Sequence, residues 1–179
     1  MSFDPFKIRA VVREFEALND GYRTASAATR ARHPVIADIA YGAAPRQKLD
    51  LFAPEGGGSG RPVHLFLHGG YWRANDRENY HFIADTVLAA GAIAVIAEYT
   101  LMPGARMAQL VDEVRAAAAW VGMHIAQYGG DAGRLTASGH SAGAHLASYL
   151  SGRGWRGWQR RSWCCSKPPA ATMGGCGWL

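Results

Sequence analysis

The 179-residue chain is long enough for one domain with a hydrophobic core, and its 49% hydrophobic residues exclude a chain that is disordered by composition. The net charge of +5 is unevenly placed. Residues 1–151 hold all 14 acidic residues and 14 of the 19 Lys and Arg, so the excess lies wholly in residues 152–179. The main body therefore predicts neither a nucleic-acid nor a membrane partner. No run of about 18 apolar residues predicts a membrane-spanning helix.

The ends of the chain carry little targeting or redox information. The first residues, from Met1 to Pro5, lack a basic segment followed by an apolar stretch, so the sequence predicts no signal peptide and a cytoplasmic location. Cys164, Cys165 and Cys176 are all in the last 28 residues. Their spacing does not match paired zinc ligands, and their odd number does not suggest a disulfide framework, so we expect no metal site.

The first third of the chain predicts a helix followed by a hairpin. Apolar residues recur at helical spacing over residues 6–32, with a break expected at Asn19-Asp20-Gly21. Residues 35–41 and 47–53 have the pattern of two strands, which we expect to pair at the edge of a sheet. The glycine-rich stretch 54–62 predicts a surface loop, and it lacks the Gly-Lys-Ser/Thr that a phosphate-binding loop requires.

Apolar strands then alternate with amphipathic helices. The first helix is expected to be capped by Asn75 or Asp76 and closed by Gly91, and the second to end at Gly129-Gly130. This order predicts an α/β fold with a mostly parallel sheet and helices on both faces. Ligands of such sheets bind at the carboxyl ends of the strands. The expected strands are 63–68, 92–97 and 135–138.

The segment Gly139-His140-Ser141-Ala142-Gly143 has the Gly-x-Ser-x-Gly pattern between an expected strand and an expected helix. A serine nucleophile needs a sharp turn that exposes its hydroxyl, and flanking glycines let the strand and helix pass closely. Ser141 is the predicted nucleophile of an acyl transfer, and the N–H of Ala142 the predicted donor to the oxyanion. The alternative is a chance match in a chain with 22 glycines.

A second glycine-rich turn, His68-Gly69-Gly70-Tyr71-Trp72, follows the first apolar strand. Exposed N–H groups at Gly69, Gly70 and Tyr71 could supply further oxyanion donors; the alternative is a plain tight turn. We expect His68 to hydrogen-bond this loop and hold its shape, in preference to acting as a general base. Tyr71 and Trp72 either line an acyl pocket or cover the core, and the sequence does not decide between the two.

Two histidines flank the predicted nucleophile. His140 precedes Ser141 and His145 lies one helical turn beyond it, and neither is placed to reach round to the serine hydroxyl. We expect both to pack or to hydrogen-bond. His140 and Trp72 are the candidate residues of a substrate pocket, and Asp131 is expected to be a turn acid.

Four motifs together resemble the α/β-hydrolase fold, over about residues 35–150. Within it, they are similar to the kynurenine formamidase (arylformamidase) branch of the esterase and lipase-like enzymes. The resemblance implies hydrolysis of N-formyl-kynurenine or small aryl esters and amides, without a metal or organic cofactor. It makes Ser141 the nucleophile and places Gly70, Tyr71 and Ala142, with the adjacent Gly69, in the oxyanion hole. The motifs are His68–Trp72, Glu98–Leu101, Tyr128–Asp131 and Gly139–Leu146.

The resemblance also implies a triad in the order serine, acid, histidine. No Asp or Glu follows Ser141 in the sequence, and His145 is the one later histidine, so the triad acid and base are absent. We therefore interpret residues 1–151 as the N-terminal part of an α/β-hydrolase domain. Residues 152–179, which are basic and rich in Trp and Cys, are interpreted as a disordered tail from out-of-frame translation; the alternative is a true nucleic-acid or membrane contact.

The sequence thus predicts a serine hydrolase that cleaves a small ester or amide through an acyl-enzyme. Its partner is a small-molecule substrate, with no nucleic acid, membrane or cofactor expected. The alternatives are a catalytically inactive fragment of such a hydrolase and a generic carboxylesterase. Because the strand before Ser141 has nothing after it to pair with, we also expect an exposed sheet edge and a chain that is poorly soluble or partly unfolded.

Overall fold

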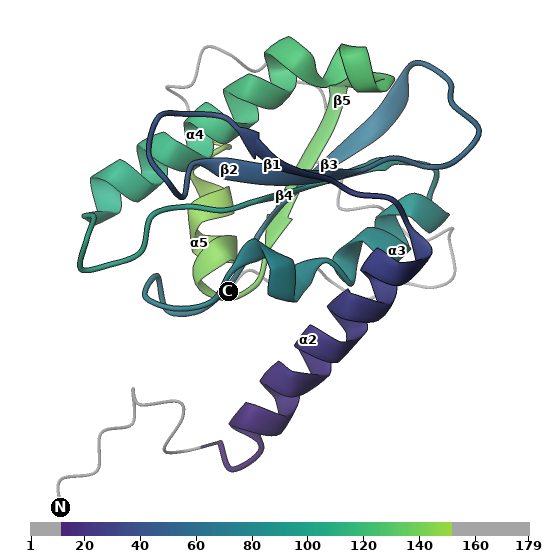
Figure 1. The fold of residues 1–179 in the computed structure, drawn as a ribbon. Coiled ribbons are helices and arrows are strands. Elements are labelled where there is room, and N and C mark those ends of the chain that lie inside the picture. Colours follow the sequence, from purple (N-terminus) through teal and green to yellow (C-terminus); the bar gives the residue numbers. More distant parts are fainter. Residues whose placement is uncertain (1–11, 152–179) are drawn as a thin grey trace, which may run out of the picture.

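The computed structural model describes residues 12–151, which form a five-stranded mixed sheet with helices on both faces (Figure 1). The strand order is β1-β2-β4-β3-β5. Strand β4 pairs in parallel with β3, and β3 in parallel with β5, whereas the β1–β2 and β2–β4 pairs are antiparallel. The predicted α/β fold is confirmed. The strands are β1 (Ile36–Ala40), β2 (Lys48–Phe52), β3 (Arg61–Leu67), β4 (Ile93–Ala97) and β5 (Gly130–Gly139).

Helices cover the two faces unequally. Side chains such as Leu65 and Leu67 of β3 join the larger core cluster with residues of α4 and α5, whereas Phe66, on the opposite face, packs with residues of α3. The helix expected from Asn75 or Asp76 to Gly91 is instead two elements, η1 and α3, with a short break between them. The helical elements are α2 (Phe15–Arg32), η1 (Arg77–Tyr80), α3 (Ile83–Ala89), α4 (Met107–His124), η2 (Ile125–Tyr128) and α5 (Ala142–Ser148).

Helix α2 is continuous, so the break expected at Asn19-Asp20-Gly21 was wrong. Asp20 is paired with Arg23 across one turn, at 2.6 Å, and Gly21 is part of the helix. One face of α2 packs against the rest of the protein, and tertiary packing of such a face outweighs the cost of about 1 kcal/mol that a helical glycine carries. Residues 6–11 of the expected helix lie outside the described residues.

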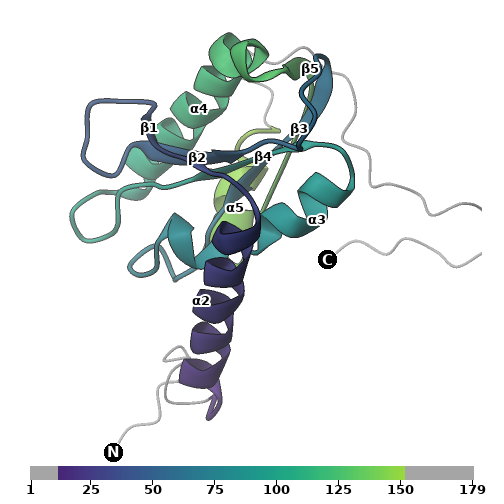
Figure 2. The same cartoon turned by 45° about the vertical axis from the view of Figure 1, so that its right-hand side comes forward.

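Helix α2 is fixed from Tyr22 to Thr29 to α3 and the segment before it. The hydroxyl of Thr29 donates to Asp85 at 2.9 Å, and the ring of Tyr22 stacks on Phe82 with centroids 5.1 Å apart. The buried hydroxyl of Ser26 accepts a hydrogen bond from the N–H of Phe82 at 3.2 Å. Both views show the N-terminal half of α2 projecting away from the sheet (Figures 1 and 2).

Strand β5 brings the two glycine-rich turns together. Its register with β3 places Leu67 opposite Gly139, so the loops that follow both strands leave the same end of the sheet. Within residues 12–151, β5 is an edge strand, and Thr136 on it is exposed. Low solubility of the chain stays a prediction, which light scattering at increasing protein concentration would test. The interpretation of residues 152–179 lies outside the described residues.

Candidate active site

A serine stands on a strained turn between β5 and α5. Ser141 has φ of 51° and ψ of −113°, after β5 ends at Gly139 and before α5 begins at Ala142. A residue held in such a sparsely populated conformation stores about 1–3 kcal/mol and persists only where the surrounding structure holds it. The side chain of Ser141 is exposed. This is the backbone geometry that a nucleophile elbow requires.

The flanking glycines are required by close contacts between backbones. A Cβ on Gly139 would lie 2.3 Å from the carbonyl carbon of Gly143. A Cβ on Gly143 would lie 2.1 Å from the carbonyl oxygen of Leu67 and 2.5 Å from that of His68. The N–H of His140 also donates to the Leu67 carbonyl at 3.1 Å. The elbow is therefore pressed against the end of β3, where the second loop begins.

That second loop has three consecutive residues with positive φ: Gly70 (125°), Tyr71 (55°) and Trp72 (59°). A Cβ on Gly70 would lie 2.1 Å from the carbonyl oxygen of Ala74, so this position needs glycine. The loop is held by the Trp72 carbonyl, which accepts a hydrogen bond from Met102 N–H at 2.7 Å. Positive φ is costly for residues other than glycine, such as Tyr71 and Trp72, and the hydrogen bonds of this loop retain it.

The loop and the elbow leave N–H groups free for an oxyanion. Among residues 12–151, no hydrogen bond uses the N–H of Gly70, Tyr71 or Ala142. Ala142 opens α5, where the first N–H groups of a helix lack partners within the helix. Gly69 supplies close approach, because a Cβ there would lie 2.6 Å from Nδ1 of His140. The four residues therefore lie together at the elbow, and their role as an oxyanion hole stays a prediction.

His68 is fully buried at the foot of the loop and makes no hydrogen bond with Ser141. Its Nδ1 lies 2.7 Å from the carbonyl oxygen of Gly69, and its Nε2 lies 2.6 Å from Oε1 of Glu98. The imidazole stacks on Tyr99, with centroids 4.3 Å apart. These contacts place His68 where it holds the loop, as the sequence indicated.

Glu98 had no assigned role in the sequence, yet it organises this buried network. It follows β4 and is 2% exposed. Besides His68, its carboxylate contacts Nη2 of Arg46 at 2.8 Å and accepts hydrogen bonds from the N–H groups of Arg77 and Tyr99. Burial works to raise the pKa of Glu98, but the His68 hydrogen bond and the charges of His68 and Arg46 hold it below its usual value. An acid directly after a fully apolar strand was the available signal.

His140 contacts the buried Tyr80, to which the sequence pattern assigned no role at the site. The hydroxyl of Tyr80 lies 3.0 Å from Nδ1 of His140 and accepts a hydrogen bond from Asn75 at 3.4 Å. Burial raises the pKa of this phenol, so it stays protonated at neutral pH, and the tautomer of His140 sets which of the two groups donates. Tyr22 of α2 packs edge-on to the His140 ring at 6.2 Å. No sequence spacing links residues 22, 80 and 140.

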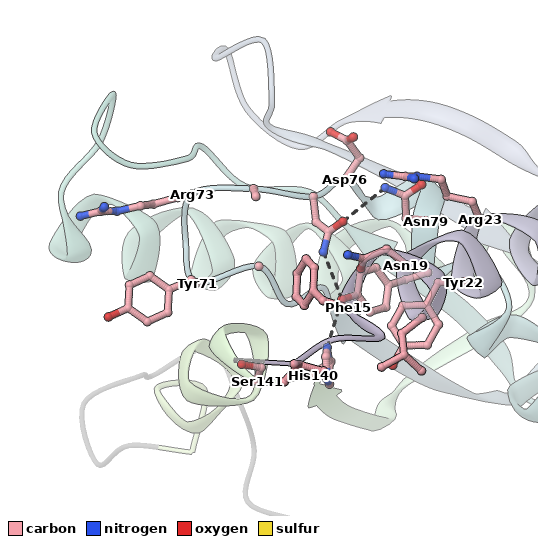
Figure 3. Close-up of a pocket in the computed structure, with 16 residues that line it drawn as sticks. Phe15, Asn19, Tyr22, Arg23, Tyr71, Arg73, Asp76, Asn79, His140 and Ser141 are labelled. Carbon is pink, nitrogen blue, oxygen red and sulfur yellow. Dashed lines mark hydrogen bonds between the residues drawn. The ribbon is translucent and has the colours of Figure 1, made fainter. Parts of the chain in front are cut away.

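Ser141 opens into a cavity of about 720 Å³ (Figure 3). Its wall combines four parts of the chain: the elbow, the loop after β3, the segment leading into η1, and the N-terminal half of α2. His140, a candidate pocket residue from the sequence, lines this cavity, and its contact with substrate stays a prediction. The lining residues are Val12, Phe15, Leu18, Asn19, Tyr22, Arg23, Gly70, Tyr71, Arg73–Asp76, Asn79, Tyr80, His140 and Ser141.

The two aromatic residues of the loop have different places. Tyr71 lines the cavity and is 47% exposed. Trp72, a candidate pocket residue from the sequence, is instead packed against the core and meets the ring of His145 edge-on at 5.4 Å. The correction has a local cause: the positive φ of both residues turns the chain so that Trp72 faces inward.

The part of the chain that the structure describes provides no base for Ser141. None of its histidines is hydrogen-bonded to Ser141, and His145 packs between Trp72 and Tyr149. Residues 12–151 also contain no cluster of three His, Cys, Asp or Glu that could hold a metal ion. None of their helices is long and apolar enough to cross a membrane.

We expect Gly143→Ala to destabilise the protein and to displace the elbow, because the added methyl group would meet the backbone carbonyls of Leu67 and His68 at the end of β3. The matched control is Gly122→Ala in α4, where a Cβ meets nothing within 4 Å. That control should raise the free energy of unfolding by about 0.5–1 kcal/mol. Urea unfolding followed by circular dichroism measures both; equal stability of the Gly143 variant and wild type would contradict the prediction.

Glu98→Gln should flatten the loss of stability in acid. Because the folded pKa is lowered, the stability contributed by ionised Glu98 is present above the unfolded pKa of about 4.3 and is lost as the pH falls through the folded pKa. Urea unfolding from pH 3 to pH 7 should therefore show a shallower pH dependence in the variant. Glu55→Gln, in an exposed loop, is the control and should follow wild type. Identical slopes in all three proteins would refute the role of Glu98.

Comparisons with known proteins agree with this geometry. The BD-FAE family model matches residues 49–154. Kynurenine formamidase from Danio rerio is 33% identical over 139 residues, which cover 78% of this chain and 45% of that protein. Esterase LipQ from Mycobacterium tuberculosis is 35% identical over 62% of this chain and 27% of its own length. The chain therefore spans less than half of the length of these curated relatives.

Solved structures give the same result. The structure of a provisionally assigned thioesterase from Silicibacter sp. TM1040 superposes with a TM-score of 0.70 and 26% identity, over 81% of this chain and 53% of that one. Esterase Est2 from Thermogutta terrifontis has a TM-score of 0.56 and 26% identity, over 62% of this chain and 42% of its own. The chain belongs to the BD-FAE family of the α/β-hydrolase fold, a family of esterases and related hydrolases.

Proposed function

We propose that the protein hydrolyses a small ester or amide through an acyl-enzyme formed on Ser141. The observation that carries this proposal is the strained backbone of Ser141 beside a loop in which the N–H groups of Gly70 and Tyr71 have no partner among the described residues. A plain turn would not need positive φ at Tyr71, Trp72 and Ser141 together. Strain of this kind collects at sites where it serves the chemistry.

In the proposed reaction, Ser141 Oγ attacks the substrate carbonyl carbon, and the carbonyl oxygen becomes an oxyanion. The free N–H groups of Ala142 and of Gly70 or Tyr71 stabilise that charge, and each such donor is worth about 3 kcal/mol of transition-state stabilisation. The leaving group departs with a proton, and water then releases the acyl group from Ser141. The cavity supplies the room for the substrate on the side of α2.

For the acyl group we propose a short one. Est2 from Thermogutta terrifontis has been solved with propionate and with butyrate bound. The likeness to kynurenine formamidase supports formyl as the acyl group and an aryl amine, as in N-formyl-kynurenine, as the leaving group. The aromatic rings of Tyr22 and Phe15 in the cavity wall fit an aryl group.

Two alternatives have support of their own. The likeness to esterase LipQ and to Est2 favours a general carboxylesterase. A chain that carries the elbow without turning over substrate is favoured by the lack of any histidine hydrogen-bonded to Ser141 among residues 12–151, because a serine hydroxyl without a base is a poor nucleophile.

The test compares hydrolysis of p-nitrophenyl acetate and of N-formyl-kynurenine by wild type, Ser141→Ala and Ser148→Ala. Ser148 is an exposed serine on the same helix and serves as the matched control. We expect turnover that Ser141→Ala reduces to the uncatalysed rate and Ser148→Ala leaves unchanged. Cleavage of the ester alone supports the carboxylesterase, and no turnover by any of the three proteins supports the inactive chain.

A further inference from the structure

We propose that the N-terminal half of α2, with Asn79 of η1, forms a specificity subsite for the part of the substrate remote from the reacting carbonyl. This subsite selects an aryl group that carries a neutral hydrogen-bonding substituent, such as a carboxamide. The inference rests on the proposed function only in taking Ser141 as the reacting end of the cavity. It assigns substrate selection to a helix that lies more than 100 residues before the nucleophile in the sequence.

The cavity extends from Ser141 across to α2. Ser141 and His140 lie on one side of it, and Asp76, Asn79 and Arg23 on the other (Figure 3). A small acyl group at Ser141 would fill only part of about 720 Å³, a volume within the range of cavities that enclose ligands of drug size. The remaining space is bounded by α2, so the larger part of a bound substrate must meet this helix.

Helix α2 gives the cavity an apolar wall. Phe15, Leu18 and Tyr22 all line the cavity, and Leu18 is 53% exposed. The ring of Tyr22 packs against the rings of Phe82 and Tyr80, with centroid distances of 5.1 Å and 5.7 Å. A half-buried ring held in this way offers a rigid flat surface, on which an aryl group can stack with little loss of side-chain entropy.

Three asparagine side chains line the cavity and differ in whether their hydrogen-bonding groups are already used. Both amide atoms of Asn75 are used, since its Oδ1 accepts from Asn79 and its Nδ2 donates to Tyr80, each at 3.4 Å. By contrast, the carboxamide of Asn19 and the Oδ1 of Asn79 take part in none of the hydrogen bonds among residues 12–151. The cavity wall therefore presents the whole free amide of Asn19 and the free acceptor oxygen of Asn79 beside aromatic rings. A carboxamide, which carries both a donor and an acceptor, matches this set.

The charged side chains on the α2 side of the cavity are paired with opposite charges. The guanidinium of Arg23 is paired with Asp20 at 2.6 Å, and the carboxylate of Asp76 lies 3.3 Å from Arg46. Arg73 lines the cavity from the loop after β3, and its guanidinium lies 6.0 Å from the ring of Tyr71, on the side away from α2 in Figure 3. On the α2 side of the cavity, the carboxamides are thus the polar side chains with groups that lack a partner among residues 12–151, which favours a neutral substituent over an ion there.

Equilibrium binding to the full-length Ser141→Ala protein tests the subsite without turnover. Two probes share a ring and an acyl group, acetanilide and 2-acetamidobenzamide, and only the second carries a carboxamide. Isothermal titration calorimetry should show the second binding about tenfold more tightly, as expected for one or two net hydrogen bonds. Adding Asn19→Leu and Asn79→Leu should abolish that preference and change acetanilide affinity less than twofold.

Gln127→Leu, an exposed amide replacement on η2, is the matched control and should keep the tenfold preference. Should the double variant not fold, Asn19→Ala alone, at a partly exposed position of α2, should reduce the preference about threefold or more. Equal affinity for the two probes, or a preference that survives the asparagine replacements, would overturn the proposal. Loss of ester hydrolysis in the previous experiment would not, because this measurement uses a protein without the nucleophile.

Discussion

The site depends on the close contact between the backbone of the elbow and the end of β3. Because β3 and β5 are parallel neighbours, their following loops leave the sheet side by side. Gly143 then passes so near to the carbonyls of Leu67 and His68 that any side chain would push the two loops apart. This steric constraint fixes the position of Ser141 relative to the loop that supplies the other N–H groups, before any catalytic contact is made.

A buried charged network maintains the loop at the cost of desolvation. The carboxylate of Glu98 is removed from water, and it is compensated by His68, Arg46 and backbone N–H groups. A buried pair of this kind gives little net stability but strongly penalises other arrangements of its partners. Here the partner His68 contacts the Gly69 carbonyl, so the same network restricts the loop that holds Gly70 and Tyr71 in strained conformations.

The cavity is lined by residues from both ends of the described chain. Its reactive side comes from the last strand and helix, and its far side from α2, which is anchored to α3 through Ser26 and Thr29. Tyr80 links the two sides, since its ring contacts Tyr22 and its hydroxyl contacts His140. A movement of α2 would therefore shift His140, the residue directly before Ser141, through the packing of Tyr22 on Tyr80 and the hydrogen bond between Tyr80 and His140.

Local pattern determined the strand-turn-helix around Ser141, the buried strands β3 and β4, and the loop-holding place of His68. These follow from periodicity and from glycines whose need is set by neighbouring residues. Tertiary structure alone decided the partners that are distant in sequence. Glu98 meets His68 across two strands, Tyr80 meets His140 across 60 positions, and α2 continues through Gly21 because its packed face outweighs a weak helix former. Sequence spacing carries no record of such contacts, because they arise only when separate elements pack.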